Sequence, residues 1–173
     1  MAQTDITAPP CTQEVVVTRL INAPREVVYK TVTDPLMIPK WWGPSRFTTK
    51  VINMAVMPGG NWRFLQKDNE GKEYGFHGVY HEVLIPERLI YTSEYEGTPG
   101  HVTLITDKFT ERDGITIITS TTVFQSVEDR DQMLLWGMEE GTTAMTNRLN
   151  EILKMENIQE RKDLACESHQ SIS

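Results

Sequence analysis

The sequence predicts an α+β fold with a seven-stranded curved antiparallel sheet, two short helices after strand 1, and a long C-terminal helix across the concave face. Three observations predict it. Residues 47–124 consist of short β-branched and aromatic runs separated by turn residues. Two helix-compatible segments precede them, and residues 129–156 carry apolar side chains three or four positions apart. The connections are short, which favours antiparallel neighbours.

The first strand is predicted at Glu14–Ile21, "EVVVTRLI", which is short and β-branched. The segment that follows, "NAPREVVYKTVTD", predicts a short helix, with Pro24 at a first helical position. Asp34 precedes Pro35 in the order of an N-cap followed by proline, so we expect a second short helix ending near Pro39. Two helices therefore separate the first strand from the rest of the sheet.

Six more strands follow, each ending at turn residues. Asp113 and Gly114 give the strongest hairpin signal, between the last two runs. The runs are "FTTKVINMAV", "NWRFLQ", "YGFHGVYHEVLI", "RLIYTSEYE", "HVTLITDKFTE" and "ITIITSTTVFQ".

A long amphipathic helix is predicted after Ser126, with Asp129 completing an approximate capping box. About 28 residues at 1.5 Å per residue would extend roughly 42 Å, enough to cross a small sheet. Its apolar stripe needs a concave surface, which a twisted sheet provides. The stripe comprises Leu134, Met138, Gly141, Met145, Leu149 and Ile152.

The chain of 173 residues is the size of one ordinary domain, predicted at residues 13–156. Residues 1–12 and 157–173 are predicted to be polar tails, since neither has an apolar period. Cys11 and Cys166 lie in these tails, and we expect two free thiols.

The formal charge of −7 disfavours nucleic acid as a partner. No apolar run is long enough to cross a bilayer, so we expect no membrane insertion and a cytoplasmic location. Catalytic-triad order, a phosphate loop and a cysteine-nucleophile setting are all missing, and no cofactor is expected.

His77 and His81, followed by Glu82, would suggest a zinc site if they lay on a helix. Gly75, Gly78 and the alternation of aromatic and β-branched residues indicate a strand instead. Two residues four positions apart in a strand stand roughly 13 Å apart, too far to share one metal ion. No metal site is predicted, and Tyr80 and Glu82 are expected on the face opposite the histidines.

Four motifs carry a family resemblance over about residues 14–155. They are "INAPREVVYKTVTDP" at 21–35, "WWGP" at 41–44, "PGGNWRF" at 58–64 and "HGVYHEVLIPERLIYT" at 77–92. Their order resembles the START-like or SRPBCC superfamily of helix-grip proteins, which includes the birch-pollen allergen fold. Within it the chain resembles the bacterial branch named for the C-terminal domain of the activator of the heat-shock-protein ATPase.

The resemblance implies a ligand cavity between the sheet and the long helix. Two departures imply a roomier or more polar interior: Thr142 follows Gly141 where the family usually has tryptophan, and Thr92 is followed by Ser93, not tryptophan. Core packing is the alternative for each aromatic residue. Gly141 either permits close approach to the sheet or leaves room for a ligand. The predicted ligand-binding residues are Trp41, Trp42, Phe47, Trp62, Phe64, Phe76, Tyr80, Tyr91, Met138, Gly141 and Met145.

Three functions stay open at this stage. The first is binding of a small hydrophobic or aromatic ligand, lipid-like or polyketide-like, without fixed catalytic apparatus. The second is a cyclase or hydratase of the same fold, which needs at least two of His77, His81, Tyr80, Glu94 and Asp107 inside the cavity. The third is a chaperone-ATPase co-activator with a role in the stress response, although only about 13 residues precede the first strand. A homodimer is a further possible assembly.

Overall fold

The computed structural model describes the backbone of residues 3–170 and the side chains of residues 3–157. It forms one eight-stranded antiparallel sheet in the order β1-β2-β8-β7-β6-β5-β4-β3. The strands are β1 (Thr4–Thr7), β2 (Glu14–Ile21), β3 (Thr48–Met54), β4 (Asn61–Lys67), β5 (Glu73–Leu84), β6 (Arg88–Tyr95), β7 (Thr103–Arg112) and β8 (Ile115–Val123).

All seven predicted strands are present. The predicted total of seven is wrong, because the sheet has an eighth strand, β1, that was not predicted. This strand lies where the sequence predicts a tail, and it pairs with β2 so that Thr4 stands opposite Arg19. Its four residues have no strong apolar pattern, so the pairing with a neighbouring strand defines them, which is a tertiary effect.

The two short helices are present with different details. Helix α1 (Arg25–Val32) has Pro24 as its N-cap, one position before the predicted first turn. Helix α2 (Ile38–Trp41) begins later than predicted, with Pro39 inside its first turn and not at its end. Asp34 instead organises a preceding turn, because its Oδ1 accepts a hydrogen bond from the Leu36 amide.

The predicted single long helix is two helices, α3 (Val127–Leu135) and α4 (Met138–Gln170). Gly137 separates them with a φ of +90°, a left-handed conformation that glycine adopts without steric cost and that typically ends a helix. The spacing of four between Leu134 and Met138 hides this break, since both side chains pack against the same buried cluster at Phe124. Helix α4 also continues past the predicted end of the domain to Gln170.

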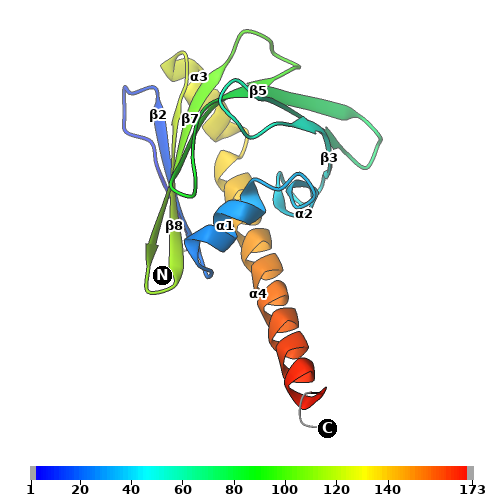
Figure 1. Ribbon diagram of the computed structural model, residues 1–173. Coiled ribbons are helices and arrows are strands. Elements are labelled where there is room, and N and C mark those ends of the chain that lie inside the picture. The colour runs from blue at the N-terminus through cyan, green and yellow to red at the C-terminus, as the bar shows by residue number, and fades with distance from the viewer. Residues whose placement is uncertain (1–2, 171–173) are drawn as a thin grey trace.

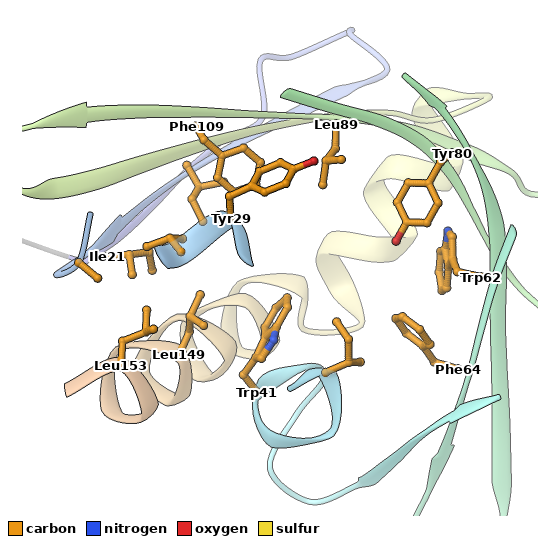
Figure 2. Packing of buried hydrophobic residues seen from close by; sticks show 14 residues of the cluster. Ile21, Tyr29, Trp41, Trp62, Phe64, Tyr80, Leu89, Phe109, Leu149 and Leu153 are labelled. Atoms are coloured by element: carbon orange, nitrogen blue, oxygen red, sulfur yellow. The ribbon is translucent and has the colours of Figure 1, made fainter. Parts of the chain in front are cut away.

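Helix α4 crosses the concave side of the sheet and extends beyond it toward the C-terminus (Figure 1). Its buried Leu149 and Leu153 pack with Ile21 in the main core. Tyr29 of α1 meets Phe109 edge to face with ring centroids 5.3 Å apart. Figure 2 shows these residues gathered at one end of the interior, with Trp62, Phe64 and Tyr80 at the other.

The side chain of Cys11 is a free, exposed thiol as predicted, whereas that of Cys166 lies outside the described side chains. Within the described residues, no helix is both long enough and apolar enough to span a membrane.

Candidate functional site

A cavity of about 200 Å³ lies between the inner face of the sheet and helices α2 and α4. Strand alternation supplies the sheet side, because every second residue of a strand points to the same face. Met138, Thr142 and Met145 supply the side formed by α4, one helical turn apart. The curved sheet and the helix therefore leave a partly open space between them instead of meeting in full contact.

Four aromatic residues form one wall. Trp42 packs edge to face on Phe64 at 5.1 Å and on Trp62 at 6.4 Å between ring centroids. Trp62 and Phe64 project from β4 into the interior, and Trp41 of α2 faces the same space (Figure 2). Aromatic side chains give this wall a large apolar surface of defined shape.

Gly78 makes the position of Trp62 possible. The indole Nε1 of Trp62 donates a 3.2 Å hydrogen bond to the carbonyl oxygen of Thr92, passing directly over Gly78. A Cβ built on Gly78 would lie 2.7 Å from that nitrogen and 1.8 Å from the Thr92 oxygen. Only glycine leaves room for this hydrogen bond.

The "WWGP" corner is tied to the rest of the structure by hydrogen bonds. The guanidinium of Arg148 on α4 donates to the carbonyl oxygens of Lys40, at 3.1 Å, and Gly43, at 2.9 Å. Thr49 of β3 donates to the Trp42 oxygen at 3.0 Å. These hydrogen bonds hold the corner between α4 and β3, while Trp41 and Trp42 line the cavity.

The neighbouring wall is polar, and it adjoins the aromatic wall where Tyr91 meets Trp62 edge to face, at 6.4 Å between ring centroids. The Tyr91 hydroxyl donates a 3.0 Å hydrogen bond to Oδ2 of Asp107, which is 7% exposed. Burial raises the pKa of Tyr91 well above 10.0, and the negative charge of Asp107 raises it further. The pKa of Tyr80 is also raised, first by burial and then by Asp107. Both phenols thus stay protonated, as hydrogen-bond donors, well into the alkaline range.

Arg19 reaches the same wall from β2. It is 9% exposed, and its Nη2 donates a 3.1 Å hydrogen bond to the Ser120 hydroxyl on β8. Ser120 stands opposite Asp107 in the β7–β8 register. A polar row therefore runs across neighbouring strands along one side of an otherwise apolar cavity.

Eight of the eleven predicted ligand-binding residues line this cavity. They are Trp41, Trp42, Trp62, Phe64, Tyr80, Tyr91, Met138 and Met145. Their binding of a ligand stays a prediction.

The other three predicted residues do not line the cavity. Phe47 packs on Tyr74 at the edge of the sheet, at 5.4 Å between centroids. Phe76 points inward but packs behind Trp42, at 5.4 Å. Gly141 faces Pro44, whose Cγ lies 3.8 Å from where a Cβ would be, so the glycine neither permits close approach to the sheet nor leaves room for a ligand.

Sequence reasoning missed most of the polar residues. Thr142 lines the cavity at the position where the family usually has tryptophan, in agreement with a more polar interior. A usable signal was present: polar residues stand at inward positions of strands whose other inward residues are apolar, as Arg19 does between Val17 and Ile21. The missed polar lining residues are Arg19, Ser120, Thr122 and Thr142.

The histidines lie on the outer face of β5. His77 contacts Glu94 through Nε2 at 3.0 Å and Glu96 through Nδ1 at 3.3 Å, and His81 is exposed. The described residues contain no group of three acidic, histidine or cysteine side chains placed to hold a metal ion. Of the aromatic residues and histidines of this strand, only Tyr80 thus lines the cavity.

The expected position of Glu82 beside Tyr80 is wrong. The register with β6 shifts between Tyr80 and Glu82, so that His81 is the extra residue of a bulge. Glu82 therefore turns to the outer face and pairs with Arg88. Of the five residues proposed for catalysis, Tyr80 and Asp107 line the cavity, while His77, His81 and Glu94 do not.

Comparisons with known proteins agree with this fold. The family model described as "Activator of Hsp90 ATPase homolog 1-like protein" matches residues 22–154. No curated protein matches this chain by sequence. The resemblance predicted from the four motifs is confirmed by the family match.

Solved structures are similar over most of the chain. Protein Ms6760 from Mycobacterium smegmatis is 25% identical, with a TM-score of 0.79 over 87% of this chain and 96% of its own. A protein from Rhodobacter sphaeroides is 22% identical, with a TM-score of 0.80 over 87% of this chain and 98% of its own. A protein from Arthrobacter aurescens is 20% identical, with a TM-score of 0.80 over 87% of this chain and 91% of its own.

Proposed function

The chain belongs to the Activator of Hsp90 ATPase homolog 1-like family, and we propose that it binds a small aromatic ligand in the cavity between sheet and helix. The observation that carries this proposal is a partly open cavity with one aromatic wall and one polar wall. Binding sites for small molecules are typically apolar with a few polar groups that fix orientation.

The size of the cavity limits the ligand. A dry protein cavity of about 150 Å³ is large enough for benzene, and pockets for drug-sized molecules begin at about 300 Å³. The present cavity, at about 200 Å³, lies between these values. A single substituted aromatic ring fits this range, and a long acyl chain or a multi-ring polyketide would need the cavity to enlarge.

The test is a thermal-shift and native mass-spectrometry screen of small aromatic compounds against gently purified protein. A binder should raise the melting temperature and change the fluorescence of Trp41, Trp42 and Trp62, measured in a Trp136→Phe background because Trp136 is exposed. Thr142→Trp should fill the cavity and abolish binding. Thr143→Trp, at the next and exposed position of α4, is the matched control.

Two results would contradict the proposal. One is that no compound of this size raises the melting temperature. The other is that Thr142→Trp and Thr143→Trp bind equally well, which would place the binding elsewhere. The melting temperature of each variant without ligand reports whether it is folded.

A cyclase or hydratase activity in the same cavity is supported by one observation. Tyr80, Tyr91 and Asp107 bring two protonated phenols and a carboxylate to one wall, and such groups can transfer protons. The expected outcome is turnover of an aromatic ligand by the wild type and none by Asp107→Asn. Binding without turnover leaves ligand binding as the function.

The remaining predictions are not supported by a specific feature of the cavity. A role as a chaperone-ATPase co-activator in the stress response comes from the family's name alone, and fold alone does not fix function. A pull-down with the chaperone tests it. The cytoplasmic location and the homodimer stay predictions from the sequence.

A further inference from the structure

Two oppositely charged side chains are buried in the polar wall without contacting each other. Arg19 and Asp107 are 9% and 7% exposed, and both line the cavity. They form no ion pair with each other among the described residues, and Ser120 on β8 lies between their strands. Burying a charge is costly unless it is paired or fully hydrogen-bonded, so this arrangement requires an explanation.

The hydrogen-bonding capacity of both groups is largely unused. A guanidinium has five N–H donors, and Arg19 donates to one side-chain partner, Ser120. A carboxylate has about four acceptor sites, and Asp107 accepts one hydrogen bond, from Tyr91. Nε of Arg19 and Oδ1 of Asp107 are buried with no partner.

These unpaired groups are concentrated at the cavity. Within the described residues, six buried side-chain atoms lack a hydrogen-bond partner, and three of them belong to residues that line it: Arg19, Trp41 and Asp107. Buried polar groups are normally satisfied, so a cluster of exceptions around one space points to a ligand that satisfies them. The sheet wall offers donors at Arg19 and an acceptor at Asp107.

We propose that Arg19 and Asp107 recognise the polar end of the ligand, a neutral planar group that carries a hydrogen-bond acceptor beside a donor, as an aryl carboxamide or lactam does. The carbonyl oxygen accepts from Arg19, and the N–H donates to Asp107. An anionic ligand meets the negative charge of Asp107, and a cationic one meets the positive charge of Arg19, so a neutral group is favoured. This inference rests on the proposed function and deepens it.

Three probes of nearly equal shape test the inference. α-Methylstyrene has no polar group, acetophenone has only the acceptor, and benzamide has the acceptor and the donor. Dissociation constants are measured for each probe by calorimetry or ligand-observed NMR. Hydrogen bonds to charged groups are worth about tenfold or more in affinity, so their loss is measurable.

Each variant has its own expected pattern. Arg19→Met weakens acetophenone and benzamide by about tenfold and does not weaken α-methylstyrene. Asp107→Asn, which keeps the shape of the side chain, weakens benzamide alone. Arg88→Met makes the same chemical change on the outer face of the sheet, where Arg88 pairs with Glu82, and changes none of the three affinities.

The outcomes separate the two proposals. If α-methylstyrene binds but neither variant discriminates among the probes, the ligand class is overturned and the proposed function stands. If no probe binds the wild type, the ligand class is overturned, and the screen of small aromatic compounds decides the proposed function. If the protein binds benzoate more tightly than benzamide, the proposal that the polar end of the ligand is neutral is overturned. If a variant does not fold, the orientation of benzamide is measured in the wild type by nuclear Overhauser contacts from its amide protons to the Tyr91 ring. The absence of these contacts with benzamide bound overturns the inference.

Discussion

The Tyr91 hydroxyl and the Asp107 carboxylate are joined by a 3.0 Å hydrogen bond that crosses from β6 to β7 inside the cavity. The two residues are not directly opposite, because Tyr91 pairs with Ile105 and Asp107 pairs with Leu89. The bond is therefore a diagonal contact on the inner face of the sheet. Asp107 is the only buried carboxylate among the described residues, and Tyr91 is the only residue whose hydroxyl donates a hydrogen bond to it there.

Removing this hydroxyl should destabilise the protein. Tyr91→Phe leaves the buried Asp107 carboxylate without its partner, and the expected loss in the free energy of unfolding is about 1–3 kcal/mol. Tyr80→Phe is the control, since the Tyr80 hydroxyl has no hydrogen-bond partner among the described residues and its loss should cost less. Urea denaturation at neutral pH measures both, and equal losses would contradict the assigned role of the bond.

Alkaline pH should destabilise the fold through Tyr80 and Tyr91. Their pKa values are raised in the folded protein by burial, so the unfolded chain loses these protons first as the pH rises above about 10. The contribution of the two protonated phenols to the free energy of unfolding is fully present below that pH and is lost as the pH rises above it. The double variant Tyr80→Phe/Tyr91→Phe should show a shallower decline than the wild type in denaturation series at rising pH. If the stability of the double variant declines with pH as steeply as that of the wild type, groups other than these two tyrosines cause the decline.

Acid should weaken the outer face of the sheet at Glu96. Hydrogen bonds from Arg63 Nε, at 2.6 Å, and Nη2, at 2.9 Å, lower the pKa of this carboxyl below 4.5, with a contribution from His77. A lowered pKa contributes stability that is present above pH 4.5 and is lost as the pH falls through the folded value.

Glu96→Gln should therefore make the loss of stability as the pH falls below 4.5 shallower, as followed by denaturation at each pH. Glu140→Gln, at an exposed position of α4, should leave that profile unchanged. If both variants keep the wild-type profile, the ion pair with Arg63 contributes nothing to acid stability.

Two glycines should respond in opposite directions to alanine. Gly141→Ala places its Cβ 3.8 Å from Pro44, an ordinary contact, and should stabilise α4 by about 0.5–1 kcal/mol through helix propensity. Gly78→Ala drives its Cβ into the Thr92 oxygen and should cost about 1–3 kcal/mol. Melting temperatures measure both changes. A stabilising Gly78→Ala would refute the close packing of Trp62 over this residue.

Local patterns predicted most of the elements because strands and helices have fixed periods. The strand Glu14–Ile21 has its predicted bounds, and the alternation in β5 correctly separates Tyr80 from His77. The periodic pattern gave wrong predictions where a single residue interrupts the strand or helix period. His81 forms a bulge that turns Glu82 outward, and Gly137 breaks a helix whose apolar spacing continues across the break.

The sequence by itself determined the fold class, the family and most of the aromatic lining of the cavity, because these depend on repeated signals spread along the chain. Tertiary structure alone decided the polar wall. Arg19 and Asp107 are 88 positions apart, and they line one cavity only because β8 pairs with β2 on one side and with β7 on the other. Which buried charges share a space is set by strand order and register, and no local period of the sequence carries that information.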